Sequence, residues 1–416
     1  MKLQKYSFGI GDRFGRQGKA QLAAIIKAKK NGVNITPVWN KSNREHTIIG
    51  TTPQDTRREA DEAVLSCGWT DPYFVDADHI GLNNVDTFIG SSDFFTLDVA
   101  DFIGHPAQES EIQAFIEKHK KLIGLVAIPG IDETLEIAEQ QVQGIAGKCL
   151  LAIKEASKIY RYIEAAKGTN NFITEVSMDE TDQPQTPVEM LFILAAIADE
   201  GIPARTIAPK FTGRFNKGVD YVSDVEMFSK EFKADVAVVD FAIKEFDLPE
   251  ELKLSVHSGS DKFSIYGPIA KTLKQFDAGL HLKTAGTTWL EELIGLAMAG
   301  GDGLALAKEI YGKAVSRIDE LCAPYATVID IDRDKLPAPE IVDRWDEEAF
   351  ASALRHDQSC DKYDLNFRQL LHVAYKIPAE MGLRYMDALE KYEDIIAQNV
   401  TENLYDRHIR PLFIDV

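Results

Sequence analysis

The stretch Glu251-Leu-Lys-Leu-Ser-Val-His-Ser-Gly-Ser260 decides how the rest of the sequence is interpreted. Apolar and polar residues alternate up to Val256, which predicts a short strand. Directly after that strand come the imidazole of His257, two hydroxyls and the flexible Gly259. A strand that ends in polar side chains and leads into a helix is the unit in which an α/β barrel carries its chemistry.

The same unit of strand, polar loop and helix recurs along the chain. We expect eight strands, over residues 6–11, 34–40, 73–79, 94–99, 171–176, 204–210, 252–257 and 278–283. Eight strands alternating with helices predict an α/β fold of the (β/α)8 TIM barrel type. The catalytic barrel domain is expected over residues 1–325, with a helical insertion near 105–167. A C-terminal helical extension, residues 326–416, is expected to pack on the barrel.

The alternative fold is a doubly wound parallel sheet that binds a dinucleotide. That fold requires a GxGxxG fingerprint between a strand and a helix. Gly9 and Gly11 supply only GxG, Gly15 falls one place late for the third glycine, and no GxxxxGK[ST] motif is present. We therefore expect no nicotinamide cofactor.

The composition excludes several classes of protein. The 416 residues include 46 basic and 66 acidic side chains, a net charge of −20, which repels nucleic acid. A transmembrane helix is not expected either, because no run of about 18 apolar residues is present. The four cysteines form no CxxC pair and the N-terminus lacks the apolar core of a signal peptide, so we expect a cytoplasmic protein with reduced thiols. Homo-oligomer formation stays open.

Titratable residues gather at the ends of the predicted strands, and in a barrel these ends meet at one mouth. The candidates are Asp76, Asp78, His79, Glu175, Asp179, Lys210, His257, Asp261, His281 and Lys283. Two or three imidazoles with one carboxylate are the ligands of a catalytic divalent transition metal ion such as Zn²⁺, Mn²⁺, Co²⁺ or Ni²⁺. Each histidine alone is also compatible with a capping or hydrogen-bonding role. Lys210 and Lys283 lie on apolar strands, so each is expected to face a carboxylate or an anionic substrate.

Five longer stretches carry a resemblance to a known family. They are PVWNKSNREH (37–46), VDADHIG (75–81), PKFTGRFNKGVDYV (209–222), SVHSGSDKF (255–263) and HLKTAGTTWLEE (281–292). With these stretches the chain resembles the tagaturonate epimerase family, also called the tagaturonate–fructuronate epimerase family, of bacterial hexuronate catabolism. The resemblance implies an isomerase that inverts C4 of a 2-keto hexuronate and so interconverts D-tagaturonate and D-fructuronate.

A second resemblance concerns the predicted metal site. Asp78-His79 and His257-Ser-Gly-Ser260 are similar to the Asp-His and His-Gly-Gly-Ser elements of class II, metal-dependent aldolases, with Ser258 where that family has glycine. This resemblance implies that His79 and His257 bind the metal ion and that Asp78 is an acid or base. Glu175 and His281 are added as metal ligands because of their positions on the strands alone.

The expected reaction restricts the mechanism, because the C4 hydrogen is not adjacent to the ketone. Retro-aldol cleavage of C3–C4 yields an enediolate that a metal ion stabilises, and re-addition after rotation inverts C4. Asp78 or Glu175 is expected to take the C4 hydroxyl proton, with Lys283 as a further catalytic residue. The carboxylate is expected to bind a cation among Lys210, Arg214, Lys217 and Lys283. Further substrate contacts are expected from Ser258, Asp261 and Thr284.

One other route for the same reaction and two other functions fit the same residues less well. Transient oxidation at C4 requires a nicotinamide cofactor, which the sequence does not predict. A class II-type metal-dependent aldolase acting on a sugar acid releases its two fragments instead of rejoining them. A non-catalytic sugar-acid binding protein does not explain so many titratable groups at strand ends.

Overall fold

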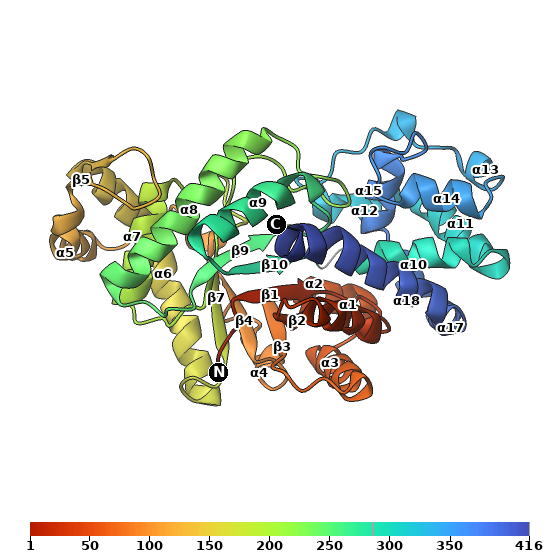
Figure 1. The fold of residues 1–416 in the computed structure, drawn as a ribbon, viewed down its shortest axis with the longest axis horizontal. Helices are drawn as coiled ribbons and strands as arrows, with labels where there is room; N and C mark the ends of the chain where they lie inside the picture. The colour runs from red at the N-terminus through yellow and green to blue at the C-terminus, as the bar shows by residue number, and fades with distance from the viewer. Residues whose placement is uncertain (285–286, 416) are drawn as a thin grey trace.

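Eight parallel strands close into a barrel in the computed structural model, which describes residues 1–284 and 287–415 (Figure 1). The strands are β1 (Tyr6–Ile10), β2 (Ile35–Ser42), β3 (Phe74–Ile80), β4 (Phe94–Asp98), β7 (Ile173–Ser177), β8 (Thr206–Ala208), β9 (Lys253–His257) and β10 (Leu280–Lys283). Closure pairs β1 with β10, so that Tyr6 lies opposite Leu280. All eight predicted strands are present, and the prediction of a TIM barrel is confirmed. Ala285 and Gly286, which belong to the motif at 281–292, and Val416 lie outside the described residues.

The barrel interior is built in layers. Four of its buried apolar residues, Val38, Phe74, Phe94 and Ile173, form a cluster of their own with Leu3. Because side chains alternate along a strand, the interior residue two places further on belongs to the next layer toward the barrel mouth. At those places the sequence has Asn40, Asp76, Thr96 and Glu175. An apolar layer therefore lies beneath a polar one.

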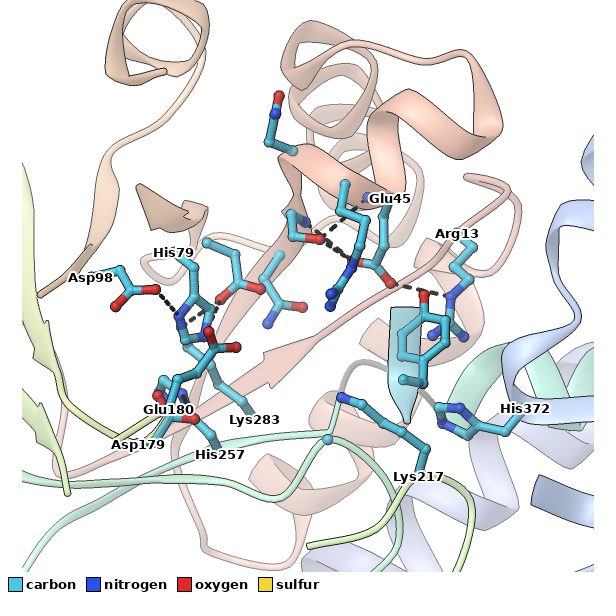
Figure 2. Close-up of a pocket in the computed structure, with 17 residues that line it drawn as sticks. Arg13, Glu45, His79, Asp98, Asp179, Glu180, Lys217, His257, Lys283 and His372 are labelled. Carbon is cyan, nitrogen blue, oxygen red and sulfur yellow. Dashed lines mark hydrogen bonds and ion pairs between the residues drawn. The ribbon is translucent and has the colours of Figure 1, made fainter. Parts of the chain in front are cut away.

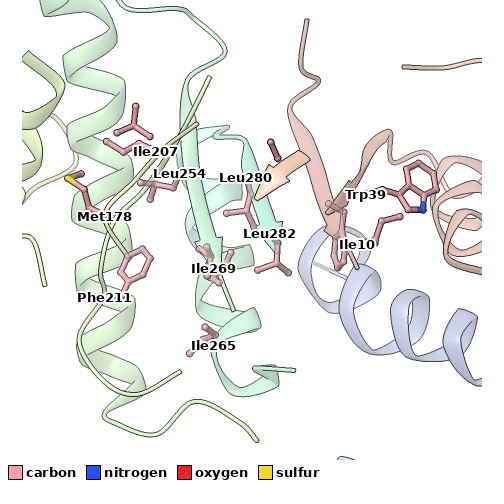
Figure 3. Packing of buried hydrophobic residues seen from close by; sticks show 14 of the residues in the cluster. Ile10, Trp39, Met178, Ile207, Phe211, Leu254, Ile265, Ile269, Leu280 and Leu282 are labelled. Atoms are coloured by element: carbon pink, nitrogen blue, oxygen red, sulfur yellow. The ribbon is translucent and has the colours of Figure 1, made fainter. Parts of the chain in front are cut away.

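The outward-facing strand residues pack against the surrounding helices. Leu254, Leu280 and Leu282 lie beside Ile265 and Ile269 of α9 in the main hydrophobic core (Figure 3). The helices that follow the first seven strands are α1 (Gly18–Lys30), α2 (Asn43–Ile49), α3 (Pro53–Cys67), α4 (Val85–Ile89), α6 (Glu139–Lys167), α7 (Pro187–Asp199), α8 (Val225–Phe246) and α9 (Phe263–Phe276).

The insertion after β4 differs in part from its prediction. It contains α5 (Glu109–His119) and a small antiparallel sheet of β5 (Gly124–Val126) and β6 (Leu135–Ile137). The predicted helical insertion near 105–167 is therefore not helical throughout, and its long helix α6 begins at Glu139. Since α6 packs against β4 and α7, it also serves as the barrel helix of this unit.

The C-terminal part of the chain is helical, and its helices α11 to α17 lie at the opposite end of the molecule from the insertion (Figure 1). Its helices are α10 (Thr287–Met298), α11 (Gly301–Ser316), α12 (Ile318–Cys322), α13 (Pro339–Val342), α14 (Glu347–Leu354), α15 (Leu365–Val373), α16 (Lys376–Met381), α17 (Leu383–Lys391), α18 (Glu393–Glu402) and the π-helix η5 (Asn403–Ile414). Short 3-10 turns occupy Ala100–Phe102, Lys120–Leu122, Ala323–Tyr325 and Arg333–Lys335.

The last helix completes the outer ring of the barrel. η5 packs against both α1 and α9, and the ring of Phe413 lies 4.6 Å from that of Tyr6 on β1. The helix that directly follows β10, α10, packs instead against α18, α11 and α14. The end of the chain therefore takes the place of the eighth barrel helix. Within residues 1–284 and 287–415, no helix combines the length and apolar character that crossing a membrane requires.

Candidate active site

A buried ionic cluster lies at the carboxyl ends of four strands. The Nζ of Lys283 on β10 lies 2.8 Å from Asp76 Oδ2, 2.9 Å from Asp78 Oδ1 and 3.0 Å from Glu175 Oε1, and it donates to Thr96 Oγ1 at 2.6 Å. Burial alone would lower the pKa of Lys283, but the three carboxylates raise it well above its usual range. Lys283 is therefore a charged ammonium group in contact with three carboxylates.

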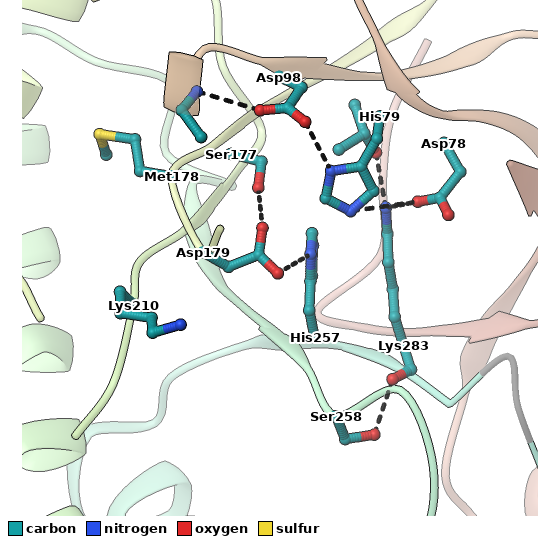
Figure 4. A network of polar contacts seen from close by, with 12 residues as sticks. Asp78, His79, Asp98, Ser177, Met178, Asp179, Lys210, His257, Ser258 and Lys283 are labelled. Atoms are coloured by element: carbon teal, nitrogen blue, oxygen red, sulfur yellow. Dashed lines mark hydrogen bonds and ion pairs between the residues drawn. The ribbon is translucent and has the colours of Figure 1, made fainter. Parts of the chain in front are cut away.

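Two imidazoles lie beside this cluster, and Figure 4 shows His79 paired with Asp98 and His257 paired with Asp179. His257 Nε2 lies 2.8 Å from Glu175 Oε1, and His79 Nδ1 lies 3.2 Å from Asp98 Oδ2. The ring centroids are 5.2 Å apart. The buried Nδ1 of His257 lies 3.1 Å from Asp179 Oδ2, yet it makes no hydrogen bond within the described part of the chain.

His79 reaches this place because the strand is irregular. Neighbouring residues of a strand normally point to opposite faces. The pairing of β3 with β4 shifts between Ala77 and Ile80, and His79 has a φ of 54°, in the left-handed region that non-glycine residues rarely adopt. Asp78 and His79 therefore line the same cavity although they are adjacent in sequence.

The donor set of this site fits a divalent transition metal ion. One ligand atom from each of His79, Asp179 and His257 lies within 4.8 Å of the other two. Two imidazoles and a carboxylate that leave positions open are typical of catalytic sites for such ions. Metal-binding histidines usually donate their other N–H to a carboxylate, and Asp98 and Glu175 are placed to accept it.

The surrounding carboxylates favour the protonated, positively charged forms of the two imidazoles. Burial alone would lower the pKa of His257, but Asp179 and Glu175 raise it to about 9. Burial has the same effect on His79, and Asp78 with Asp179 raises its pKa to about 10. A metal ion bound between the imidazoles would interact with the same carboxylates in place of these protons.

A cavity of about 330 Å³ has these groups on one wall, a volume within the range of small-molecule sites. Figure 2 shows Arg13, Lys217 and His372 on the side of the cavity away from His79 and Asp98. A neighbouring cavity of about 470 Å³ shares several lining residues with the first, and these are Arg44, Asp179, Glu180, Lys217, His257, Gly259 and Tyr325. An acidic, imidazole-containing wall thus faces a cationic one.

The cationic wall comes from three parts of the chain. Arg13 follows β1, and its Nε lies 3.1 Å from Glu45 Oε1. The guanidinium of Arg44, in α2, lies 5.0 Å from the ring of Tyr325. Lys217 follows β8, and burial and the charge of Arg44 lower its pKa.

Comparison with known proteins assigns the chain to a family. Residues 1–412 match the model of the tagaturonate epimerase family. The chain belongs to the tagaturonate epimerase family. It is therefore an isomerase, and the predicted family and enzyme class are confirmed.

Two epimerases from other organisms are similar to this chain. The tagaturonate/fructuronate epimerase of Thermotoga maritima is 28% identical, across 97% of this chain and 80% of that protein. A glycerol-complexed crystal structure of fructuronate-tagaturonate epimerase UxaE from Cohnella laeviribosi has a TM-score of 0.81 and 23% identity over 99% of this chain and 82% of its own. The native form of that enzyme has a TM-score of 0.79. Both crystal structures have the fold of this epimerase family member.

Two of the predicted metal ligands, Glu175 and His281, are not part of the group of His79, Asp179 and His257 in this epimerase family member. His281 is fully buried inside the barrel, two residues before Lys283, with Nδ1 2.9 Å from Ser7 Oγ and its ring 5.2 Å from that of Phe94. It lies one layer below the ionic cluster and lines neither cavity. The carboxylate of Glu175 is fully buried behind His257, where its Oε2 accepts from Thr206 Oγ1 at 2.7 Å. Glu175 orients His257 and does not join Asp179 at the ligand atoms.

Several predicted substrate contacts are also engaged elsewhere. Ser258 lines the second cavity, but its hydroxyl donates to Lys283 O at 2.7 Å, and the backbone N–H of Thr284 donates to Gly9 O at 3.1 Å. Both side chains are buried. Lys210 and Arg214 line the second cavity only. Of the predicted cations, Lys217 and Lys283 line the cavity that contains Asp78 and His79.

Asp261, a further predicted substrate contact, is fully enclosed. Its carboxylate accepts from Arg368 Nη2 at 2.7 Å and from Thr287 Oγ1 at 2.7 Å. His408 Nε2 lies 3.2 Å away and His356 Nδ1 3.3 Å away. Burial opposes ionisation, but Arg368 and the two histidines hold the pKa of Asp261 well below its usual range. Asp261 joins the C-terminal helices to the β9 loop and lines neither cavity.

Other cavity residues were not selected from the sequence. Asp98 and Glu180 form a second potential ligand group with His79. Asp98 lies at the end of the predicted strand 94–99, a signal that would have found it. Tyr325 and His372 come from the C-terminal helices, and no rule about strand ends points to them.

Proposed function

We propose that this protein interconverts D-tagaturonate and D-fructuronate by inverting C4 of the 2-keto hexuronate. Membership of the tagaturonate epimerase family supports the reaction. The observation that carries the proposal is the cavity with an imidazole-containing acidic wall opposite a cationic wall. A 2-keto hexuronate has the matching polarity, since its ketone and its carboxylate lie at opposite ends of a six-carbon chain.

A divalent transition metal ion, Zn²⁺, Mn²⁺, Co²⁺ or Ni²⁺, belongs to the proposal. His79, Asp179 and His257 would hold it, with Asp98 and Glu175 fixing the two rings. When bound, the ion supplies Lewis-acid stabilisation of negative charge on the ketone oxygen. His257 Nδ1 and Asp179 Oδ2 lie 3.1 Å apart within this ligand group, which supports the assignment.

The position of the inverted carbon favours carbon–carbon cleavage. Removal of the C4 hydrogen would leave a carbanion that the ketone cannot stabilise. Breaking C3–C4 instead leaves the electron pair in an enediolate of C1–C3, while the C4 hydroxyl loses its proton and C4 becomes an aldehyde. Rotation of this aldehyde by half a turn and re-formation of C3–C4 give the other epimer.

Asp78 is the carboxylate best placed to take the C4 hydroxyl proton. It lines the cavity, whereas Glu175 and Asp76 are fully enclosed behind it. Burial alone would raise the pKa of Asp78, but the Lys283 ammonium and the two imidazoles lower it to about 2. Asp78 is therefore ionised at neutral pH and can accept a proton through Oδ. Lys283 maintains that charge.

Metal analysis combined with an epimerase assay tests the proposal. The purified protein is expected to contain a divalent transition metal ion, to lose epimerisation of tagaturonate on chelation, and to regain it when the ion is restored. His257→Ala should lose metal binding and activity together. Full activity of the metal-free enzyme would refute the metal-dependent route, and recovery with a nicotinamide cofactor alone would indicate transient oxidation.

Assaying the three-carbon aldehyde acid separates the remaining alternatives. An epimerase that retains both fragments releases little of it. Stoichiometric release without the C4 epimer would identify an aldolase, and binding without turnover at saturating metal would identify a sugar-acid binding protein.

A further inference from the structure

Lys217 differs from the other cations near the cavity in its surroundings. Its side chain is half-buried and lines both cavities. Within the described residues, no carboxylate oxygen lies within the 4.0 Å of an ion pair with its Nζ. The ammonium lies against Gly259 of the β9 loop, where an added Cβ would be 3.1 Å from Nζ. A cation that is partly removed from water without an ion-pair partner is destabilised, so an anion at this place would bind favourably.

Of the other predicted cations, Lys210 lines only the second cavity, whereas Lys283 and Arg214 have carboxylate partners. Lys283 is surrounded by three acids. Arg214 Nη1 lies 3.3 Å from Asp330 Oδ2 and its side chain is 48% exposed. Arg13, on the cationic wall, has Glu45 at 3.1 Å. The positive charge that faces the cavity therefore comes chiefly from Lys217 and, beside it, Arg44.

The backbone around Lys217 is held from three sides. The Lys217 N–H donates to Val328 O at 2.8 Å, and the Gly218 N–H donates to Ser260 Oγ at 3.0 Å. On the far side, Arg368 Nε donates to Gly218 O at 2.6 Å while its Nη2 binds Asp261. These contacts join the β8 loop to the β9 loop and to α15.

Gly218 permits this close attachment. Its φ is +77°, a conformation that disfavours side chains, and an added Cβ would lie 3.3 Å from Arg368 O and 3.1 Å from His372 Cβ. A rigidly held cation loses little freedom when an anion binds, which increases affinity. The enclosed Asp261–Arg368 pair thus acts on the cavity through Gly218.

We propose that Lys217 and Arg44 form the subsite for the substrate carboxylate, that Ser260, Asp261 and Arg368 are positioning residues for Lys217, and that this subsite selects uronates over neutral ketohexoses. The inference rests on the proposed function for the identity of the substrate. An ammonium and a guanidinium offer charge-assisted hydrogen bonds to a carboxylate, and a neutral CH₂OH group at the same carbon cannot form them.

Lys217→Met tests the subsite directly. Loss of one charge-assisted contact should raise KM for D-tagaturonate about 10- to 100-fold, while the inhibition constant of neutral D-tagatose changes less than about threefold. Lys217→Arg should restore most of the affinity, because the charge remains. Lys271→Met removes the same charge from the exposed face of α9 and serves as the control. An unchanged KM in Lys217→Met, or an equal loss of affinity for D-tagatose, would overturn the proposal.

Ser260→Ala tests the positioning part. It removes the acceptor of the Gly218 N–H and should raise KM about 2- to 10-fold with kcat unchanged. Ser255→Ala on β9 is the matched control, because that buried hydroxyl has no hydrogen-bond partner among the described residues. The melting temperature is recorded as well, since Lys262 Nζ also donates to Ser260 Oγ at 2.8 Å. Equal KM values for the two variants would refute the positioning role.

Calorimetric binding separates this inference from the proposed function. If the wild-type enzyme fails to epimerise tagaturonate with any metal ion, the proposed reaction is wrong. Selective binding of D-tagaturonate over D-tagatose that disappears in Lys217→Met would still support the carboxylate subsite. Selective binding that persists in Lys217→Met would refute the subsite whatever the reaction.

Discussion

Two buried ionic clusters in this molecule have opposite compositions. In one, the Lys283 ammonium lies among the carboxylates of Asp76, Asp78 and Glu175. In the other, the Asp261 carboxylate lies among the side chains of Arg368, His356 and His408. Both place a central charge among groups of the opposite sign. They differ in access, because Asp78 and Lys283 line the cavity whereas every member of the Asp261 cluster is at most 1% exposed.

The two clusters differ in whether a ligand in the cavity can contact them, and this difference distinguishes a reactive cluster from a structural one. A buried charge is tolerated only when partners compensate it, and both clusters meet this requirement internally. The Lys283 cluster also borders the imidazoles and has acids in excess, so it can exchange a proton with a bound substrate. Among the described residues the members of the Asp261 cluster are enclosed, and they come from the β9 loop, α15, η5 and the segment after α14. Its role is to hold these parts together.

The largest effect is expected from Lys283→Met. Without the ammonium, only the two imidazoles offset the burial of Asp78 and its carboxyl becomes harder to ionise, so kcat should fall by about 10³-fold. Steady-state kinetics check this result. Lys253→Met is the matched control, because this buried lysine lies at the opposite end of the barrel, where its Nζ donates to Gln4 O. A folded Lys283→Met enzyme with normal kcat would exclude the cluster from the chemistry.

Asp261→Asn should affect stability instead. The substitution leaves Arg368 buried without its counter-charge, and we expect the free energy of unfolding to fall by about 3–5 kcal/mol. Urea unfolding measures this change, and kcat per folded molecule should stay unchanged. Asp302→Asn breaks the exposed pair with Lys391 and should cost less than about 1 kcal/mol. Similar losses in both variants would contradict the structural role.

Asp98→Asn tests the hydrogen bond that orients His79 beside the reactive cluster. Asp98 accepts from His79 Nδ1, and the loss of such an orienting carboxylate should weaken metal affinity about 10- to 100-fold without abolishing binding. Metal titration of the chelated enzyme gives the dissociation constant. Asp101→Asn, an exposed neighbour, is the control. An unchanged dissociation constant would mean that His79 needs no orientation by Asp98.

The barrel was predictable because local patterns repeat. Each of the eight strands combines an apolar run with a polar end, and the distance between units suits a helix. Two features depend on tertiary packing and have no such pattern. The strands of the insertion, Gly124–Val126 and Leu135–Ile137, are too short to show a period. The use of Asn403–Ile414 as the eighth ring helix depends on which helix packs better beside α1 and α9.

The sequence predicted which strand ends meet at the candidate site, but not the layer of the barrel in which each side chain lies. The convergence of strand ends predicts that Asp78, His79 and His257 come together, and they do. The rule that strand ends converge does not distinguish His281 from Lys283. The two residues are two places apart on one strand, so their side chains lie in different layers of the barrel interior. The rule also says nothing of Arg44, which acts from a helix.

His281→Asn tests whether His281 lies in a different barrel layer from the reactive cluster. Of the four substitutions in this series it should have the smallest effect. Burial lowers the pKa of His281 to about 3, whereas in the unfolded chain it is about 6.5. Between these values the unfolded chain holds a proton that the folded chain lacks, so stability falls as pH falls. From pH 7 to pH 5 this contribution is about 2 kcal/mol. Asn can keep the hydrogen bond to Ser7 without titrating, so urea unfolding should show the variant losing about 2 kcal/mol less than the wild type over this interval. Equal losses, or a variant that no longer binds metal at pH 7, would instead place His281 in the reactive cluster.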